Sequence, residues 1–277
     1  MSKKLPSKGL KLAHINICSL RNKVSEIEEI LSCGIHLLAI SETHLDDTFN
    51  DAAVDIDGYR IFRKDRNAYG GGVAVYIQKQ IPAKVRYDLM SADIEVLWLQ
   101  IHLPHLKPLL VGCCYRPPNA NLIYLDKLCE MLDKVCDLDR EIYFIGDLNI
   151  DWNMLHCALK NKLQTITTTC NLVQMVTKPT RICIKKDGSK SATCIDHIFT
   201  HFSHVCSQAI SIPVGCTDHN LIIIVRKTKV PKAGPKVIVR RSIKYFCEES
   251  FIQDVQKICW KHVFEKVDPD DALDVFN

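Results

Sequence analysis

The sequence predicts an α/β fold, because short buried strands alternate with amphipathic helices along most of the chain. Residues 10–17 have the pattern of a strand, apolar residues recur at helical spacing over 20–31, and 35–40 form a second strand. A third apolar run, 141–145, ends at Gly146 and is typical of a strand followed by a tight turn. Polar side chains follow all three strands, at the sheet edge where α/β proteins bind ligands.

Length and composition describe an ordinary globular protein. The chain has 277 residues, of which 47% are hydrophobic and 25% charged, enough for one large domain or two ordinary ones. A net charge of +4 does not by itself indicate nucleic-acid binding. We expect no secretion and no membrane insertion, since Leu5-Pro6 interrupts the N-terminal stretch and the apolar runs are short. The expected compartment is the nucleus or the cytoplasm.

The 14 cysteines contain no Cys-x-x-Cys pair, and many lie in apolar runs. We therefore interpret them as reduced core residues rather than disulfide or zinc ligands. Ser19 is expected to cap the first helix and Gly34 to end it. The remaining pattern predicts helices at 122–136 and 155–170, a basic turn at 185–191, and strands at 58–62, 73–77, 95–103, 108–115, 194–199, 210–214 and 221–226.

Two alternative readings of short motifs are rejected on their spacing. The series Asp147-x-Asn149-x-Asp151 resembles the start of an EF-hand loop, but Trp152 and Ala158 occupy the positions that require glycine and glutamate. The glycines at 70–72 are not followed by Gly-Lys-Ser/Thr, so they predict a turn into a strand rather than a phosphate-binding loop.

Polar residues at the predicted strand ends form the candidate site. Carboxylate and amide oxygens are the ligands that magnesium prefers. A histidine beside an aspartate can stabilise or protonate a phosphate oxygen. Together they favour metal-assisted hydrolysis of a phosphodiester. The residues in question are Asn16, Glu42, Tyr115, Asp147, Asn149, Asp196, Asp218 and His219.

The order of these motifs resembles the endonuclease/exonuclease/phosphatase superfamily, which includes deoxyribonuclease I-like and AP endonuclease-like enzymes. The resemblance covers about residues 10–226 and implies a four-layered α/β sandwich, with two packed mixed β-sheets flanked by helices. Further motifs are similar to the endonuclease domain of non-LTR retrotransposons of the jockey and chicken-repeat kind. They are Asn16-Ile-Cys-Ser-Leu-Arg-Asn-Lys23, Ser41-Glu-Thr-His-Leu45, Gly70-Gly-Gly-Val-Ala-Val75 and Tyr115-Arg-Pro-Pro118.

The resemblance implies a role for each candidate in metal or substrate binding. Glu42 would be the main Mg²⁺ ligand, with Asn16 beside it and Asp218 completing the metal side. Mn²⁺ would be able to replace Mg²⁺. Tyr115 would contact the phosphate or the leaving group, and the adjacent Arg116 would bind substrate.

The catalytic roles are also carried over from the family. Asp147 would orient or deprotonate the attacking water, and Asn149 would hold the phosphate. His219 would contact the phosphate and stabilise the transition state, while Asp196 would fix the orientation of its imidazole.

After residue 226 the composition changes. Residues 227–244 combine prolines with basic side chains, which predicts a linker or a nucleic-acid-contacting arm, and a helical pattern returns from Glu248. We therefore divide the chain into a domain at 10–226 and a tail at 227–277. The tail resembles the segment before reverse transcriptase in such elements. No Tyr-x-Asp-Asp motif occurs, so a polymerase is not expected in this chain.

These observations favour a monomeric, magnesium-dependent DNA endonuclease. The resemblance implies a nick with a free 3′-hydroxyl, which primes reverse transcription in the parent elements. Two alternatives remain open: a non-catalytic nucleic-acid-binding relic of a retroelement, and a phosphatase or phospholipase of the same fold. A basic arm fits the endonuclease and the relic equally well, because attraction to phosphate carries no catalytic information.

Overall fold

The computed structural model describes residues 8–184, 188–231, 246–266 and 268–269. Its contacts divide the chain into two compact units, Met1–Ala233 and Gly234–Asn277. Most of the predicted basic arm lies outside the described residues.

The first sheet of the larger unit has six strands in the order β13-β14-β1-β2-β4-β3. Strands β1 and β2 are parallel, and the other neighbours are antiparallel. The strand bounds are β1 Leu10–Asn16, β2 Leu37–Ser41, β3 Tyr59–Lys64, β4 Val73–Gln78, β13 Ile210–Ile212 and β14 Leu221–Arg226.

The second sheet also has six strands, in the order β5-β6-β7-β8-β12-β9, and β7 and β8 form its parallel pair. Its bounds are β5 Ala83–Val85, β6 Glu95–Ile101, β7 Leu109–Tyr115, β8 Ile142–Asp147, β9 Val173–Gln174 and β12 Asp196–Thr200. A separate hairpin consists of β10 Arg181–Ile184 and β11 Lys190–Thr193. Three short 3-10 turns lie at Asp51–Val54, Tyr87–Leu89 and Ser203–Val205.

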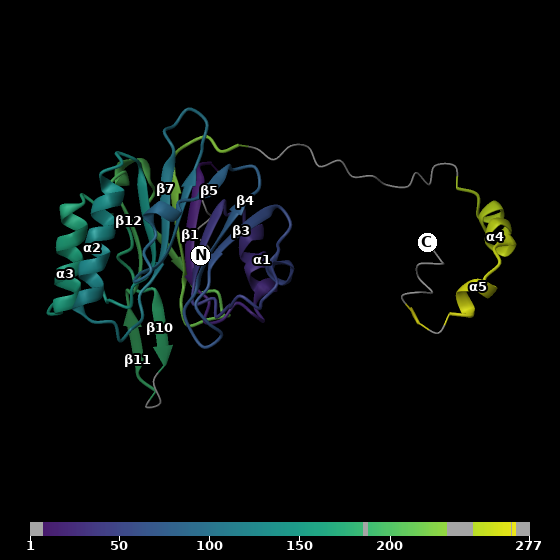
Figure 1. Ribbon diagram of the computed structural model, residues 1–277, viewed down its shortest axis with the longest axis horizontal. Coiled ribbons are helices and arrows are strands. Elements are labelled where there is room, and N and C mark those ends of the chain that lie inside the picture. Colours follow the sequence, from purple (N-terminus) through teal and green to yellow (C-terminus); the bar gives the residue numbers. More distant parts are fainter. Residues whose placement is uncertain (1–7, 185–187, 232–245, 267, 270–277) are drawn as a thin grey trace. The chain divides into compact units, whose positions relative to one another are not determined.

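The two sheets pack face to face, and helices cover their outer faces (Figure 1). Alternate residues of the strands fill an apolar layer between the sheets, where Leu12 and Ala39 of the first belong to one cluster with Leu99 and Ile145 of the second. Helix α1 (Val24–Ser32) covers the first sheet, and α2 (Leu122–Cys136) and α3 (Ala158–Thr169) cover the second. The predicted four-layered sandwich is confirmed.

Helix α2 shows how local sequence produces a layer. The Asn121 side chain accepts a hydrogen bond from the Ile123 backbone N–H and so caps the first turn. Leu125, Leu128 and Leu132 recur at helical spacing and are buried in the cluster that contains Trp98 of β6. The helix has the bounds that the sequence predicts.

The first helix differs from the prediction at its start. It begins at Val24, and Lys23 occupies the cap position without a side-chain cap. Ser19 is not a cap, because its backbone adopts φ 85° and its N–H donates to the Glu42 carbonyl at 2.8 Å. The pairing between β1 and β2 therefore continues beyond both strands, and this extension delays the helix.

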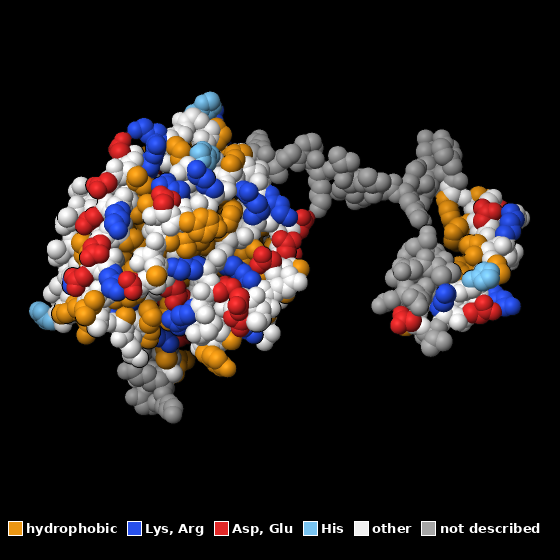
Figure 2. Space-filling view, in the orientation of Figure 1, with side chains coloured by type: hydrophobic (Ala, Val, Ile, Leu, Met, Phe, Trp, Pro, Cys, Tyr) orange, Lys and Arg blue, Asp and Glu red, His pale blue; other side chains and the backbone are white. Residues whose placement is uncertain are grey.

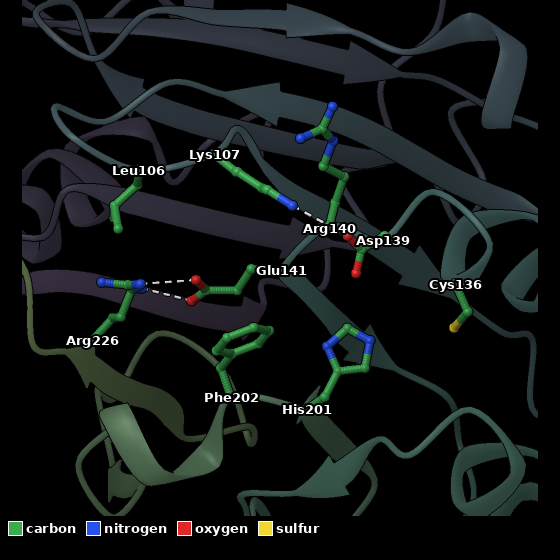
Figure 3. A pocket seen from close by; sticks show the side chains of 9 residues that line it. All are labelled: Leu106, Lys107, Cys136, Asp139, Arg140, Glu141, His201, Phe202 and Arg226. Atoms are coloured by element: carbon green, nitrogen blue, oxygen red, sulfur yellow. Dashed lines mark hydrogen bonds and ion pairs between the residues drawn. The ribbon is translucent and has the colours of Figure 1, made fainter.

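A hollow of about 390 Å³ lies at the amino end of β8, the opposite end of that strand from Asp147 (Figure 3). Arg226 and Glu141 form a bidentate ion pair on its wall, with N–O distances of 2.6 and 2.8 Å. The Tyr143 hydroxyl donates to the same carboxylate at 2.6 Å. Both charged side chains are buried, so this pair ties the last residue of β14 to the start of β8.

The smaller unit contains helices α4 (Glu248–Lys257) and α5 (Lys261–Phe264), which confirms the helical pattern expected from Glu248. Figure 2 shows lysine and arginine interspersed with aspartate and glutamate on the visible face of the larger unit. All fourteen cysteines are free thiols. Within the described ranges, the helices lack the combined length and apolar character that a membrane span requires.

Candidate active site at the strand ends

The predicted site residues of both sheets come to one edge of the sandwich. Asn16 ends β1 and Asp147 ends β8, and Glu42 directly follows β2. Strands β12 and β14 run antiparallel to their neighbours, so they begin at this same edge, where Asp196 and His219 lie. Residues far apart in sequence therefore meet because the parallel pairs end at this edge and the antiparallel strands β12 and β14 begin there.

Asp147 and Asp196 are register partners on β8 and β12, and His219 contacts both. The His219 Nδ1–H donates to Asp196 Oδ2 at 2.9 Å and lies 3.9 Å from Asp147 Oδ2. The His219 and Asp147 side chains are only 3% and 1% exposed, so only their edges reach solvent. His14 adds a further contact, with Nδ1 3.5 Å from Asp196 Oδ1.

The burial of these three groups changes how they ionise. Burial and the nearby Asp196 carboxylate raise the pKa of Asp147 to about 7. Burial opposes ionisation of Asp196, but its hydrogen bond and charge interaction with His219 outweigh that effect and lower its pKa. For the same reason the pKa of His219 is raised despite burial. The arrangement favours an ionised Asp196 beside a protonated His219.

Asn16 links the two carboxylates on the other side of Asp147. Its Nδ2 donates to Asp147 Oδ2 at 2.8 Å and to Glu42 Oε1 at 2.9 Å, while its Oδ1 accepts from the Cys18 N–H. The Tyr115 hydroxyl is hydrogen-bonded to Glu42, and burial raises the pKa of Tyr115, so it remains a donor. Asn16 therefore presents amide hydrogens, not its oxygen, to the carboxylates.

Asp218 lies on the far side of His219. Its Oδ2 accepts from Arg181 Nε at 2.6 Å, and its Oδ1 lies 4.0 Å from both His219 Nε2 and Cys18 Sγ. Arg181 starts β10, and the Ile182 N–H donates to the Asp218 carbonyl. The hairpin is therefore attached directly to the rim of the site.

Arg116 is buried beside the site, among backbone carbonyls. Its side chain is fully buried, and the guanidinium donates to the carbonyls of Leu148 and Ala120. Its own carbonyl accepts from Asn149 Nδ2 at 2.9 Å. The Asn149 N–H donates to Asp147 Oδ1 at 2.8 Å. Arg116 thus shapes the loop that positions Asp147 and Asn149, and its role in binding substrate stays a prediction.

Gly146 allows β8 to approach β7 at the site. Its φ is +153°, and a Cβ there would lie 1.8 Å from the Cys114 carbonyl oxygen. Only glycine fits without moving one strand away from the other. The glycine before Asp147 therefore fixes the position of the Asp147 carboxylate relative to Tyr115, the register partner of Asp147 on β7.

The sequence pattern of the endonuclease/exonuclease/phosphatase family matches residues 13–219, which contain this whole set of contacts. The chain belongs to this family. It is accordingly a hydrolase of the nuclease or phosphatase type. No curated protein sequence matches the chain significantly.

Solved structures share the fold of this family member. The endonuclease domain of TRAS1, a telomere-specific non-LTR retrotransposon, is 14% identical with a TM-score of 0.65 over 79% of this chain and 99% of that one. An AP endonuclease from Archaeoglobus fulgidus is 16% identical, with a TM-score of 0.66 over 79% and 100%. A 3′-5′ exonuclease from Neisseria meningitidis is 15% identical, with a TM-score of 0.64 over 79% and 100%.

The donor set of this family member suits a hard divalent cation. Carboxylates from four strand ends face one another, and among the described lysines and arginines only Arg181 forms an ion pair with them. Oxygen ligands of this kind match Mg²⁺. Glu42 and Asp147 lie on either side of Asn16, whereas Asp218 is linked to this group through His219 and Cys18. The assignment of Glu42, Asn16 and Asp218 as metal ligands stays a prediction.

Sequence reasoning missed three contributors to the site: His14, Cys18 and Arg181. His14 precedes Asn16 by two residues, and this spacing on a strand was the available signal that both face the same side. Cys18 lies inside the motif that begins at Asn16, but no role was assigned to it. Arg181 gave no signal, because its contact with Asp218 spans 37 residues and depends on the hairpin.

Proposed function

We propose that the protein is a divalent-metal-dependent DNA endonuclease that hydrolyses a phosphodiester bond and leaves a 3′-hydroxyl at the nick. The observation that carries the proposal is the position of His219, between the Asp196 carboxylate at 2.9 Å and the Asp147 carboxylate at 3.9 Å. A cationic donor and a potential base lie side by side at a strand-end site, as hydrolysis of a phosphodiester requires.

The side chains would divide the reaction between them. Asp196 holds Nδ1–H of His219, so the Nε2 edge faces the Asp218 side, where it would donate to a phosphate oxygen. Asp147 would orient the attacking water and accept its proton. Asn149, fixed by its contact with the Arg116 carbonyl, would position the phosphate beside Asp147.

The proposed cation is Mg²⁺, with Mn²⁺ able to replace it. Glu42 and Asp218 would hold it, and Asn16, which donates to Glu42 and Asp147, would steer the cation or the phosphate beside them. When bound, it would supply Lewis-acid stabilisation of the charge that develops on the phosphate. The Tyr115 hydroxyl, which is hydrogen-bonded to Glu42, would keep that carboxylate aligned and contact the phosphate or leaving group.

DNA is the proposed substrate class because of what surrounds the site. Arg181 and Lys190 belong to the hairpin attached to Asp218, and Ile184 on the same hairpin is 70% exposed. A projecting basic hairpin at the rim suits the backbone and groove of a duplex better than a small phosphate ester. The likeness to the TRAS1 domain supports a role in a non-LTR retrotransposon, in which the nick would prime a reverse transcriptase partner.

A supercoiled-plasmid nicking assay tests the proposal. Open-circle DNA should form with Mg²⁺ or Mn²⁺ and not with chelator. The Asp147→Asn and His219→Ala variants should abolish it, whereas Asp93→Asn and His156→Ala, which change exposed side chains elsewhere, should not. Salt-sensitive DNA retention without nicking would instead favour a binding relic. Release of phosphate from small esters, with no nicking, would favour a phosphatase.

The end group requires a separate measurement. A DNA polymerase should extend the nicked product directly with labelled nucleotides. Extension that occurs only after treatment with a phosphatase would show a 3′-phosphate and contradict the proposed product.

A further inference from the structure

One side chain at the site has no role in the proposed hydrolysis. Cys18 lies two residues beyond Asn16, and its thiol faces Asp218 and His219 across 200 residues of sequence. One ligand atom each from Cys18, Asp218 and His219 lies within 4.8 Å of the others. Asp218 Oδ1 is 4.0 Å from Cys18 Sγ and 4.0 Å from His219 Nε2. The three atoms form a compact sulfur, oxygen and nitrogen set.

A second contact orients the imidazole and the carboxylate of this set. His219 uses Nδ1–H to bind Asp196, which leaves the Nε2 lone pair pointing to the set in the neutral ring. Asp218 uses Oδ2 to bind Arg181, which leaves Oδ1 available as a ligand atom. Carboxylate-bound histidines of this kind are typical of metal ligands, because the carboxylate fixes the tautomer.

Backbone contacts hold the thiol in place. The Cys18 N–H donates to Asn16 Oδ1 at 3.0 Å, and Lys23 Nζ donates to the Cys18 carbonyl at 3.2 Å. The residue has φ 47°, a conformation that these contacts maintain. The Thr217 hydroxyl lies 3.6 Å from Sγ. Cys18 is thus a half-buried thiol that is fixed toward the other two ligand atoms.

We propose that Cys18 Sγ, Asp218 Oδ1 and His219 Nε2 form a binding site for a thiophilic divalent cation, Zn²⁺, which adjoins the proposed Mg²⁺ site and shares Asp218 with it. A sulfur, nitrogen and oxygen set matches zinc and is unsuited to magnesium. Three protein ligands leave a fourth position for water. Binding forms a zinc–sulfur bond and releases the thiol proton to solvent.

The site predicts that zinc inhibits the enzyme, an extension that rests on the proposed function. Zinc would occupy His219 Nε2, the atom assigned to the phosphate, and Asp218, assigned to the magnesium side. Magnesium-supported nicking should therefore stop when zinc binds. Binding itself does not depend on the protein being a nuclease, so the two parts can fail separately.

Cobalt(II), a spectroscopic replacement for zinc, tests the binding. Wild-type protein titrated with Co²⁺ should develop a thiolate-to-cobalt charge-transfer band that saturates at one equivalent and is displaced by Zn²⁺. Cys18→Ser should lose this band. Cys216→Ser, which changes another half-buried cysteine two residues before Asp218, should keep it. A band that persists in Cys18→Ser, or no band in the wild type, would overturn the site.

A measurement on the unaltered protein guards against misfolding of the variant. Iodoacetamide labelling of Cys18, followed by mass spectrometry, should slow more than about tenfold with one equivalent of Zn²⁺ and remain unchanged with Mg²⁺. Equal labelling rates with and without zinc would refute coordination by the thiol.

The inhibitory part is tested by nicking at fixed Mg²⁺ with increasing Zn²⁺. Half-inhibition of Cys18→Ser, relative to its own zinc-free rate, should need more than about tenfold more zinc than in the wild type. Equal sensitivity of both proteins would reject the inhibition while leaving the cobalt result valid. Absence of nicking in every sample would instead contradict the proposed function and leave the binding measurement unaffected.

Discussion

Asp147 and Asp196 face each other directly across β8 and β12, with His219 within 3.9 Å of one and 2.9 Å of the other. Like charges in opposed positions of an antiparallel pair destabilise it. The His219 imidazolium offsets that repulsion, because it binds Asp196 and lies close to Asp147. The two facing carboxylates are thus retained where the chemistry is proposed. When either charge is removed, its effect on stability and its effect on activity can be measured separately.

Asp196→Asn should preserve the shape of the site but remove the charge that orients His219. We expect nicking to fall by about 10²- to 10⁴-fold, because the amide no longer favours the required tautomer. Plasmid nicking measures the rate, and thermal unfolding should show that the variant remains folded. A variant with full activity would refute the orienting role of Asp196.

Gly146→Ala should destabilise the larger unit by more than about 3 kcal/mol, because its Cβ would lie 1.8 Å from the Cys114 carbonyl oxygen. Urea unfolding followed by tryptophan fluorescence measures the change. Gly58→Ala is the matched control: that residue has φ +83° but nothing within 4 Å of its Cβ position. The control should cost about 1 kcal/mol. Equal losses in both variants would mean that φ alone, not strand approach, requires Gly146.

Arg226→Met should leave the Glu141 carboxylate buried without its ion-pair partner and destabilise the fold by about 3–5 kcal/mol. The double variant Arg226→Met with Glu141→Gln should recover most of that loss. It removes the stranded charge and keeps an acceptor for the Tyr143 hydroxyl. Chemical unfolding of the three proteins gives the comparison. A double variant as unstable as the single one would place the loss in packing around Arg226 rather than in the charge.

His36, which lies away from the site, should make the stability of the fold depend on pH. Burial lowers its pKa from 6.5 to about 4, and nearby Lys11, whose N–H donates to Nδ1, adds to the effect. The unfolded chain takes up the proton more readily than the folded one, so stability is present above pH 6.5 and is lost as pH falls toward 4. The His36 contribution should be roughly 1 to 2 kcal/mol after allowance for partial exposure.

His36→Asn provides the measurement for that prediction. The Asn carbonyl can accept the Lys11 N–H but does not titrate. Urea unfolding at pH values from 7.5 to about 4 should show a shallower loss of stability in the variant than in the wild type. Identical pH profiles would exclude His36 as a contributor.

Sequence patterns predicted the sandwich well because strand periodicity and helix periodicity are both local signals. Strand and helix periodicity identified β1, β2, β7, β8 and α2, and the polar residues that end or follow these four strands were the ones brought to one edge. Contacts that cross the fold were beyond such reasoning. The hydrogen bond from Asn16 to Asp147 spans 131 residues, and the sequence around neither residue indicates the other as its partner.

Other contacts that the sequence did not predict have causes of the same kind. The Arg116 guanidinium donates to backbone carbonyls of two loop residues, and no local sequence pattern predicts that these carbonyls surround it. Ser19 is a good cap residue by type, and strand pairing beyond β1 overrides that preference. The β10–β11 hairpin is short, with side chains that are half-buried at most, so its apolar pattern is weak.

Leu10 and Arg226, the first and last residues of the predicted domain, are register partners on β1 and β14. Their Cα atoms are therefore about 5 Å apart, although the whole chain of the domain separates them. A linker of a few residues could join these ends, and the chain could be opened at another exposed connection, such as the one between β6 and β7. Every strand would keep its neighbours in such a circular permutant. The architecture of the site thus depends on the order of strands in the sheets, not on the order in which the ribosome makes them.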